Sequence, residues 1–136
     1  MQLKAYSHLY RVTYGDCTNG NHVYYGRYPY FLEEARGEFF RHLGTTFQDY
    51  HKQGYLFPVS EVQLKYFAPA EYDDELIIEC RATMFKGARL GFDYKIKKGS
   101  ILILEGETLH GCAGANGNVK RLPQQLKDRL QLFIED

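Results

Sequence analysis

A short loop near the amino terminus gathers the polar side chains best suited to chemistry. Residues 15–22 read Gly-Asp-Cys-Thr-Asn-Gly-Asn-His, and three tyrosines follow closely, Tyr24, Tyr25 and Tyr28. So many turn-forming residues predict a loop. Carboxylate, hydroxyl and imidazole groups orient or deprotonate water, and loops held by a rigid scaffold concentrate functional residues. We therefore take this segment as the candidate site.

The residues after the loop predict a helix whose first turn adds to the site. Apolar side chains recur at spacings of four and three along one helical face: Tyr28, Leu32, Ala35, Phe39 and Leu43. The first turn of a helix has unpaired N–H groups and partial positive charge. The backbone at Tyr25 and Gly26 is therefore expected to polarise a carbonyl or hold an oxyanion. In the alternative interpretation, Asp16, Thr18 and Asn19 only satisfy the backbone of a turn.

Alternating apolar and polar residues predict the sheet that must support this helix. The period of two appears in residues 6–14, 62–66, 76–82, 90–96 and 101–112. A short amphipathic helix is expected over 123–133, and residues 45–54 are expected to be a connection. One long helix cannot cover both faces of a sheet. The fold class is therefore α+β, with the sheet packed on or wrapped round residues 28–43.

Composition narrows the class of protein. With 136 residues, 44% of them hydrophobic, the chain is expected to form a single domain over residues 1–136. Its 17 basic and 17 acidic side chains cancel, which argues against nucleic-acid binding. Three widely spaced cysteines, Cys17, Cys80 and Cys112, fit a reducing compartment and offer no metal-ligand spacing. No apolar run suits a signal peptide or a membrane span, so we expect a cytoplasmic protein.

Several of these segments resemble the hotdog-fold acyl-CoA thioesterases of the 4-hydroxybenzoyl-CoA thioesterase family. The family signature is matched by residues 14–28, Tyr-Gly-Asp-Cys-Thr-Asn-Gly-Asn-His-Val-Tyr-Tyr-Gly-Arg-Tyr, and by Phe-Leu-Glu-Glu-Ala-Arg at residues 31–36. Residues 62–74, 105–110 and 121–123 resemble further parts of that family. The resemblance therefore covers nearly the whole chain.

The resemblance implies a fold, a reaction and an assembly. The fold is a hotdog, in which a curved antiparallel sheet wraps around one long central helix at residues 28–43. The reaction is hydrolysis of an acyl-CoA or acyl-carrier-protein thioester to a free acid and a thiol, with no cofactor and no metal. The assembly is a homodimer with active sites across subunits, and many members of the family pair further into tetramers.

The chain departs from the family at the residues that matter most. In most members the second acidic residue of the loop is the catalytic carboxylate, and Thr18 stands there in this sequence. Many relatives have His where this chain has Tyr25, and the family glycine before the Val-x-Tyr segment is Asn21. A threonine hydroxyl is a weak nucleophile unless a base lies close to it.

Three replacements for the missing carboxylate remain open. Asp16 keeps the first acidic position of the loop and would serve Thr18 or a water beside it, although its counterpart in the family is usually structural. Some polyketide-associated hotdog thioesterases use a Tyr and an Arg of the helix, which match Tyr28 and Arg36. His22 would act as a base near neutral pH, although a surface or core role is the simpler interpretation.

The sequence therefore predicts catalytic and binding roles for two groups of residues. The catalytic residues are expected to be Asp16, Thr18 and Tyr25, and the substrate is expected to contact His22, Tyr24, Gly26, Tyr28 and Arg36. The competing hypothesis is an acyl-thioester binding or assembly protein that kept the pocket and lost the carboxylate. A dehydratase on the same fold is a weaker hypothesis, because nothing here resembles the histidine motif of that branch.

Overall fold

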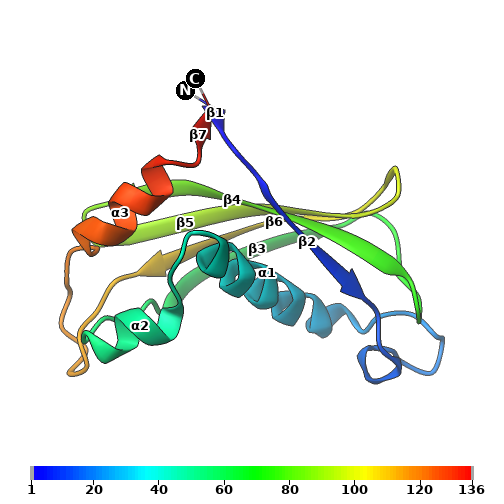
Figure 1. The fold of residues 1–136 in the computed structure, drawn as a ribbon. Helices are drawn as coiled ribbons and strands as arrows, with labels where there is room; N and C mark the ends of the chain where they lie inside the picture. Colours follow the sequence, from blue (N-terminus) through cyan, green and yellow to red (C-terminus); the bar gives the residue numbers. More distant parts are fainter. Residues whose placement is uncertain (1, 136) are drawn as a thin grey trace.

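A long helix lies against one face of a curved antiparallel sheet in the computed structural model, which describes residues 2–135 (Figure 1). The helix is α1 (Tyr28–His42). The sheet has five strands in the order β2-β4-β5-β6-β3. Their bounds are β2 (Tyr6–Arg11), β3 (Val59–Tyr66), β4 (Glu75–Lys86), β5 (Arg89–Lys98) and β6 (Ile101–Gly111). The α+β class, with a curved sheet around one long helix, is confirmed.

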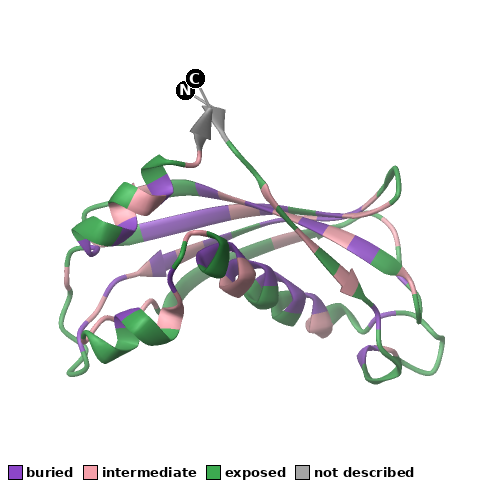
Figure 2. Cartoon of the chain, viewed as in Figure 1, coloured by how far each residue is buried: buried purple, intermediate pink, exposed green. Residues whose placement is uncertain are grey.

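The core fills the space between α1 and the sheet. The apolar stripe of the helix is buried, and its Leu32, Ala35 and Phe39 have no exposed surface. Alternate residues of the central strands face this stripe, so buried and more exposed positions alternate along β4 and β5 (Figure 2). This alternation is the period of two on which the strand predictions depended.

The carboxyl end of α1 is fixed by a third helix. Gly44 follows the helix with a φ of +87°, the left-handed conformation that glycine adopts without strain. Arg129 of α3 (Gln124–Gln131) donates from Nη1 to the Leu43 carbonyl over 2.5 Å. A cation at a helix carboxyl end also complements the helix dipole. The predicted terminal helix is therefore present, and it holds α1 in place.

Three local features differ from the expectations. A short helix, α2 (Phe47–Lys52), lies within the segment expected to be a connection, and Thr46 and Asp49 form its capping box. At the chain ends, β1 (Gln2–Leu3) pairs with β7 (Ile134–Glu135). The first strand ends at Arg11, because the chain then turns, and Tyr14 is 78% exposed instead of sharing the buried face.

Two leucine-to-alanine variants test this description of the core. Leu32→Ala is expected to lower the free energy of unfolding by about 2–5 kcal/mol, since Leu32 is fully buried and the surrounding packing cannot close the cavity completely. Leu132→Ala makes the same change at a side chain that is 78% exposed, and we expect an effect within about 0.5 kcal/mol. Urea denaturation measures both. Equal losses would contradict the assigned core.

Candidate active site

The chain between β2 and α1 folds back on itself twice. After a single turn of 3-10 helix, η1 (Tyr14–Asp16), Cys17 pairs with Val23 in an isolated bridge. The residues between them form a tight turn in which Asn21 adopts a φ of +64°, a conformation that Asn tolerates better than most residues. A second 3-10 turn, η2 (Tyr25–Arg27), then leads directly into α1. The predicted polar loop thus stands at the start of the central helix.

Asp16 holds this loop together from inside. Its carboxylate is fully buried and accepts three hydrogen bonds: from the Tyr10 hydroxyl over 2.5 Å, from the Thr13 amide over 2.8 Å and from Arg27 Nε over 2.7 Å. These donors come from β2, from the residue before η1, and from η2. Both carboxylate oxygens are thereby engaged. Asp16 ties the beginning and the end of the loop to the sheet.

The surroundings of Asp16 also set its charge. Burial by itself raises the pKa of the carboxyl, but the hydrogen bonds from Tyr10, Thr13 and Arg27 outweigh it and leave the pKa below its usual value. Burial and the bond to Asp16 raise the pKa of Tyr10 to about 12, so that phenol stays protonated and donates. Asp16 is therefore a stably ionised, weakly basic carboxylate.

Thr18 and His22 lie at the exposed tip of the loop, apart from Asp16. Thr18 donates from Oγ1 to the His22 carbonyl over 3.3 Å, and its amide donates to the same oxygen over 2.8 Å. The His22 side chain faces Glu71, with Nε2 and Oε1 3.6 Å apart. Among the hydrogen bonds of residues 2–135, none joins Thr18 to Asp16. The two predicted catalytic side chains therefore belong to different networks.

The turn before α1 contains two backbone amides without a backbone acceptor among the described residues. Within the described chain, the amides of Tyr25 and Gly26 have no backbone acceptor. The Tyr24 ring packs on Gly26, where a Cβ would come within 2.6 Å of it, so this approach needs glycine. Tyr24 and Tyr25 are 49% and 67% exposed. The Tyr66 hydroxyl of β3 donates to the Tyr25 carbonyl over 2.9 Å, which fixes the turn against an edge of the sheet.

Tyr28 and Arg36 are both buried but occupy different environments. The Tyr28 ring packs edge-on against Phe31 and against Tyr66, with centroids 5.5 Å apart in each pair. Arg36 lies eight residues further on, about 12 Å along the helix axis. Its Nη1 donates to the Tyr94 hydroxyl over 3.0 Å. No hydrogen bond in the described part of the chain joins Tyr28 to Arg36.

Arg36 meets a buried polar group that the sequence analysis did not single out. Tyr94, Thr108 and His110 follow one another by hydrogen bonds of 2.6 Å and 3.0 Å. Burial and then the Arg36 charge lower the pKa of His110 to about 4, so this imidazole is neutral at pH 7. The available signal was the strand period, because these polar residues occupy positions where β5 and β6 otherwise present apolar side chains inward.

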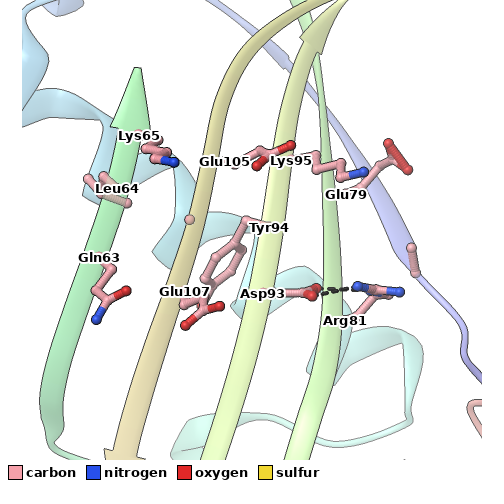
Figure 3. Close-up of a pocket in the computed structure, with 12 residues that line it drawn as sticks. Gln63, Leu64, Lys65, Glu79, Arg81, Asp93, Tyr94, Lys95, Glu105 and Glu107 are labelled. Atoms are coloured by element: carbon pink, nitrogen blue, oxygen red, sulfur yellow. Dashed lines mark hydrogen bonds and ion pairs between the residues drawn. The ribbon is translucent and has the colours of Figure 1, made fainter. Parts of the chain in front are cut away.

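A broad hollow lies elsewhere, on the face of the sheet away from α1. It has a volume of about 880 Å³ and is lined by charged side chains of four strands (Figure 3). Arg81 and Asp93 pair there over 2.9 Å and 2.5 Å, and Glu79, Lys95 and Glu105 face one another across neighbouring strands. None of the predicted site residues lines it.

Among residues 2–135, the structure shows neither a candidate metal site nor a candidate membrane-spanning helix. Over residues 2–135, no group of three or more His, Cys, Asp and Glu side chains is arranged to hold a metal ion. In the same residues, no helix combines the length and the apolar character needed to cross a membrane.

Known structures share this fold. Slr0204, a 1,4-dihydroxy-2-naphthoyl-CoA thioesterase from Synechocystis, superposes with a TM-score of 0.87 at 21% identity and covers 93% of this chain and 96% of its own. The hypothetical protein TT1821 from Thermus thermophilus gives a TM-score of 0.87 at 25% identity, with coverage of 93% and 98%. The predicted hotdog fold is confirmed by the agreement of this architecture with thioesterase structures.

Sequence comparison identifies the family. The acyl-CoA thioesterase YbgC of Haemophilus influenzae is 31% identical over 109 residues, which are 79% of this chain and 80% of that protein. The acyl-CoA thioester hydrolase YbgC of Escherichia coli O157:H7 is 35% identical over 103 residues, 75% of this chain and 77% of that protein. The family model of the thioesterase-like superfamily matches residues 12–130. The loop that Asp16 holds and the helix that follows it are therefore those of a thioesterase scaffold, and the chain belongs to the thioesterase-like superfamily.

Proposed function

We propose that this protein is an acyl-CoA thioesterase, built as a single hotdog domain over residues 1–136. The names of the YbgC relatives support the reaction. The observation that carries the site is the open turn at Tyr25 and Gly26, whose amides lack backbone acceptors within the described chain and stand beside exposed aromatic rings. Oriented amides at such a turn stabilise negative charge on oxygen. The turn is fixed by Tyr66, so its geometry is set before substrate binds.

The reaction needs a polarised carbonyl and an oriented water. The amides of Tyr25 and Gly26 hold the thioester oxygen as it becomes negative. Water oxygen bonds to the acyl carbon, the carbon–sulfur bond breaks, and one water proton leaves with the thiolate as free thiol. The Thr18 hydroxyl, at the exposed tip of the loop, orients the water. Asp16 then contributes by holding the loop, since its oxygens are fully engaged.

The remaining predicted residues line the path of the substrate. Tyr24 and His22 are exposed beside the turn and contact the thioester or its carrier. Tyr28 and Arg36 lie on the buried side of α1 and meet the acyl part. The three cysteines, Cys17, Cys80 and Cys112, are free thiols, which supports the cytoplasm as the compartment of the protein.

The site is completed by a second copy of the chain. Among residues 2–135, strand β3 pairs with β6 alone and so forms an edge of the sheet. Val59, Val62, Tyr66 and Phe67 on or beside this edge are 46–52% exposed, which is costly in a monomer. Because Tyr66 also binds the Tyr25 carbonyl, a partner added at this edge stands next to the proposed oxyanion site. The resemblance to the hotdog thioesterases extends this proposal to a tetramer, since many members of that family pair their dimers further.

Restoring the carboxylate tests the site. Thr18→Asp is expected to raise the kcat for acyl-CoA hydrolysis by about 10-fold or more, because a general base is worth roughly 100- to 10,000-fold where it is well placed. Thr18→Asn is the matched control, because asparagine has the shape of aspartate without its charge. This variant should not raise kcat. Release of free thiol from a panel of acyl-CoA esters, and from the same acyl groups on a carrier protein, measures both. A wild-type protein that binds acyl-CoA and hydrolyses neither carrier form supports the binding-protein alternative.

Asp16→Asn tests whether Asp16 is a base or a loop support. The amide cannot accept all three hydrogen bonds, so we expect a loss of about 2–4 kcal/mol in the free energy of unfolding. Turnover and affinity should fall together. Asp128→Asn makes the same change at an exposed position and should lower neither the stability nor the turnover and affinity. A fall in kcat of about 100-fold with unchanged stability and affinity would identify Asp16 as the base.

The same variant has a pH signature. The pKa of Asp16 is lowered in the folded protein, so the stabilisation it gives is present above the usual carboxyl pKa and is lost as the pH falls through the lower, folded value. Asp16→Asn lacks that loss. Urea midpoints between pH 7 and pH 3 should therefore fall less steeply for the variant than for the wild type, and parallel slopes would contradict the assignment.

A charge on the edge strand tests the dimer. Val62→Lys is expected to weaken self-association by at least about 10-fold, because a lysine on an exposed edge opposes strand pairing. It should also lower kcat, since the partner adjoins the site. Val119→Lys is the matched control at a side chain that is 79% exposed. Sedimentation equilibrium at micromolar concentration measures the association, and a wild-type species of 15.8 kDa alone would contradict the dimer.

A further inference from the structure

Four hydrogen bonds run in sequence from α1 into the sheet. Arg36 Nη1 is 3.0 Å from the Tyr94 hydroxyl, and that hydroxyl is 2.6 Å from Thr108 Oγ1. Thr108 Oγ1 is 3.0 Å from His110 Nε2, and His110 Nδ1 is 3.2 Å from the Phe57 carbonyl. Arg36, Tyr94, Thr108 and His110 are all at most 8% exposed. This hydrogen-bond relay, made of Arg36, Tyr94, Thr108, His110 and the Phe57 carbonyl, thus joins α1, strands β5 and β6 and the segment before β3.

The donor and the acceptor of every hydrogen bond in the relay follow from the two groups at its ends. A guanidinium only donates, so the Tyr94 oxygen accepts from Arg36. A carbonyl only accepts, so His110 Nδ1 carries a hydrogen and donates to Phe57. The neutral imidazole then has Nε2 free to accept from the Thr108 hydroxyl, which in turn accepts from Tyr94. Each hydroxyl donates once and accepts once, so the arrangement has one consistent set of proton positions.

Arg36, at the first position of the relay, is unusual for a buried charged residue. A buried charge is normally paired with an opposite charge. Arg36 takes part in none of the ion pairs found among the described residues. Its buried partner is instead a neutral hydroxyl, so the positive charge is oriented without being neutralised. Such a charge remains free to attract an oxygen of a ligand.

We propose that Tyr94, Thr108 and His110 are positioning residues that hold the Arg36 guanidinium in a single orientation toward the acyl part of the substrate. This inference rests on the proposed function, in which Arg36 meets the acyl part of the substrate. An arginine side chain has many rotamers, and ordering them before binding removes an entropic cost from the reaction. The relay supplies that order from residues that do not themselves touch the substrate.

Breaking the middle of the relay tests it. Thr108→Val keeps the shape and removes the hydroxyl; we expect kcat for acyl-CoA to fall by about 10- to 100-fold while KM stays within about 3-fold. Thr108→Ser keeps a hydroxyl and should restore kcat to within about 3-fold. Thr83→Val makes the same change at an exposed position of β4 and should leave kcat unchanged. Tyr94→Phe removes another hydroxyl of the relay and is used if Thr108→Val does not fold.

A double-mutant cycle separates positioning from a general effect on the fold. Arg36→Met is expected to lower kcat by at least about 10-fold, and adding Thr108→Val to it should change kcat by less than about 2-fold. An equal fall from Thr108→Val in both backgrounds would overturn the relay. The relay would also be overturned if Arg36→Met had the same kcat as the wild type. Hydrolysis by the wild type would in that case still support the proposed function. A wild type without hydrolysis would remove both.

Discussion

The burial of one face of α1 against the sheet is the interaction on which the rest of the structure depends. Leu32, Ala35 and Phe39 are completely buried there, together with the inward residues of the central strands. This contact fixes the axis of the helix, and therefore where its first turn and its later side chains stand. The loop before the helix and the edge strand beside it are placed relative to that axis. The positions of the loop and of Arg36 therefore follow from the packing of the core.

The same buried face carries a charge, which the core must accommodate. Arg36 lies one turn from Leu32 and one turn from Phe40, both with no exposed surface. Removing a guanidinium from water is costly unless it is hydrogen-bonded. Tyr94 and the groups behind it supply that bonding inside the sheet. Because Tyr94, Thr108 and His110 are hydrogen-bonded in turn, these buried polar groups are accommodated within the core.

The loop before α1 combines two opposite requirements. Its inner side must be rigid, and the buried carboxylate of Asp16 provides this through three donors from separate segments. Its outer side is open in the proposed reaction, where the Tyr25 and Gly26 amides stand beside exposed rings and have no backbone acceptor among the described residues. Asp16 thus supports the loop from the first acidic position, and Thr18 stands at the second one. In the proposed reaction, the chemistry depends on backbone donors, on Thr18 and on the charge of Arg36.

The sequence by itself determined the main elements and put the polar loop directly before the long helix, while the site at that loop stays a prediction. The spacing of Tyr28, Leu32 and Phe39 identified the helix, and the period of two identified the main strands, because local geometry dictates which side chains share a face. The short helix α2 was missed although Thr46 and Asp49 carry its capping signal. Only the tertiary structure decided the partners of Asp16, the pairing of the two chain ends and the chain of bonds behind Arg36. Tyr94 and Thr108 meet because β5 and β6 pair in a register that sets Phe92 opposite Thr108, two residues from Tyr94. Such contacts join residues far apart in the sequence, and no local pattern encodes which hydroxyl will face which charge.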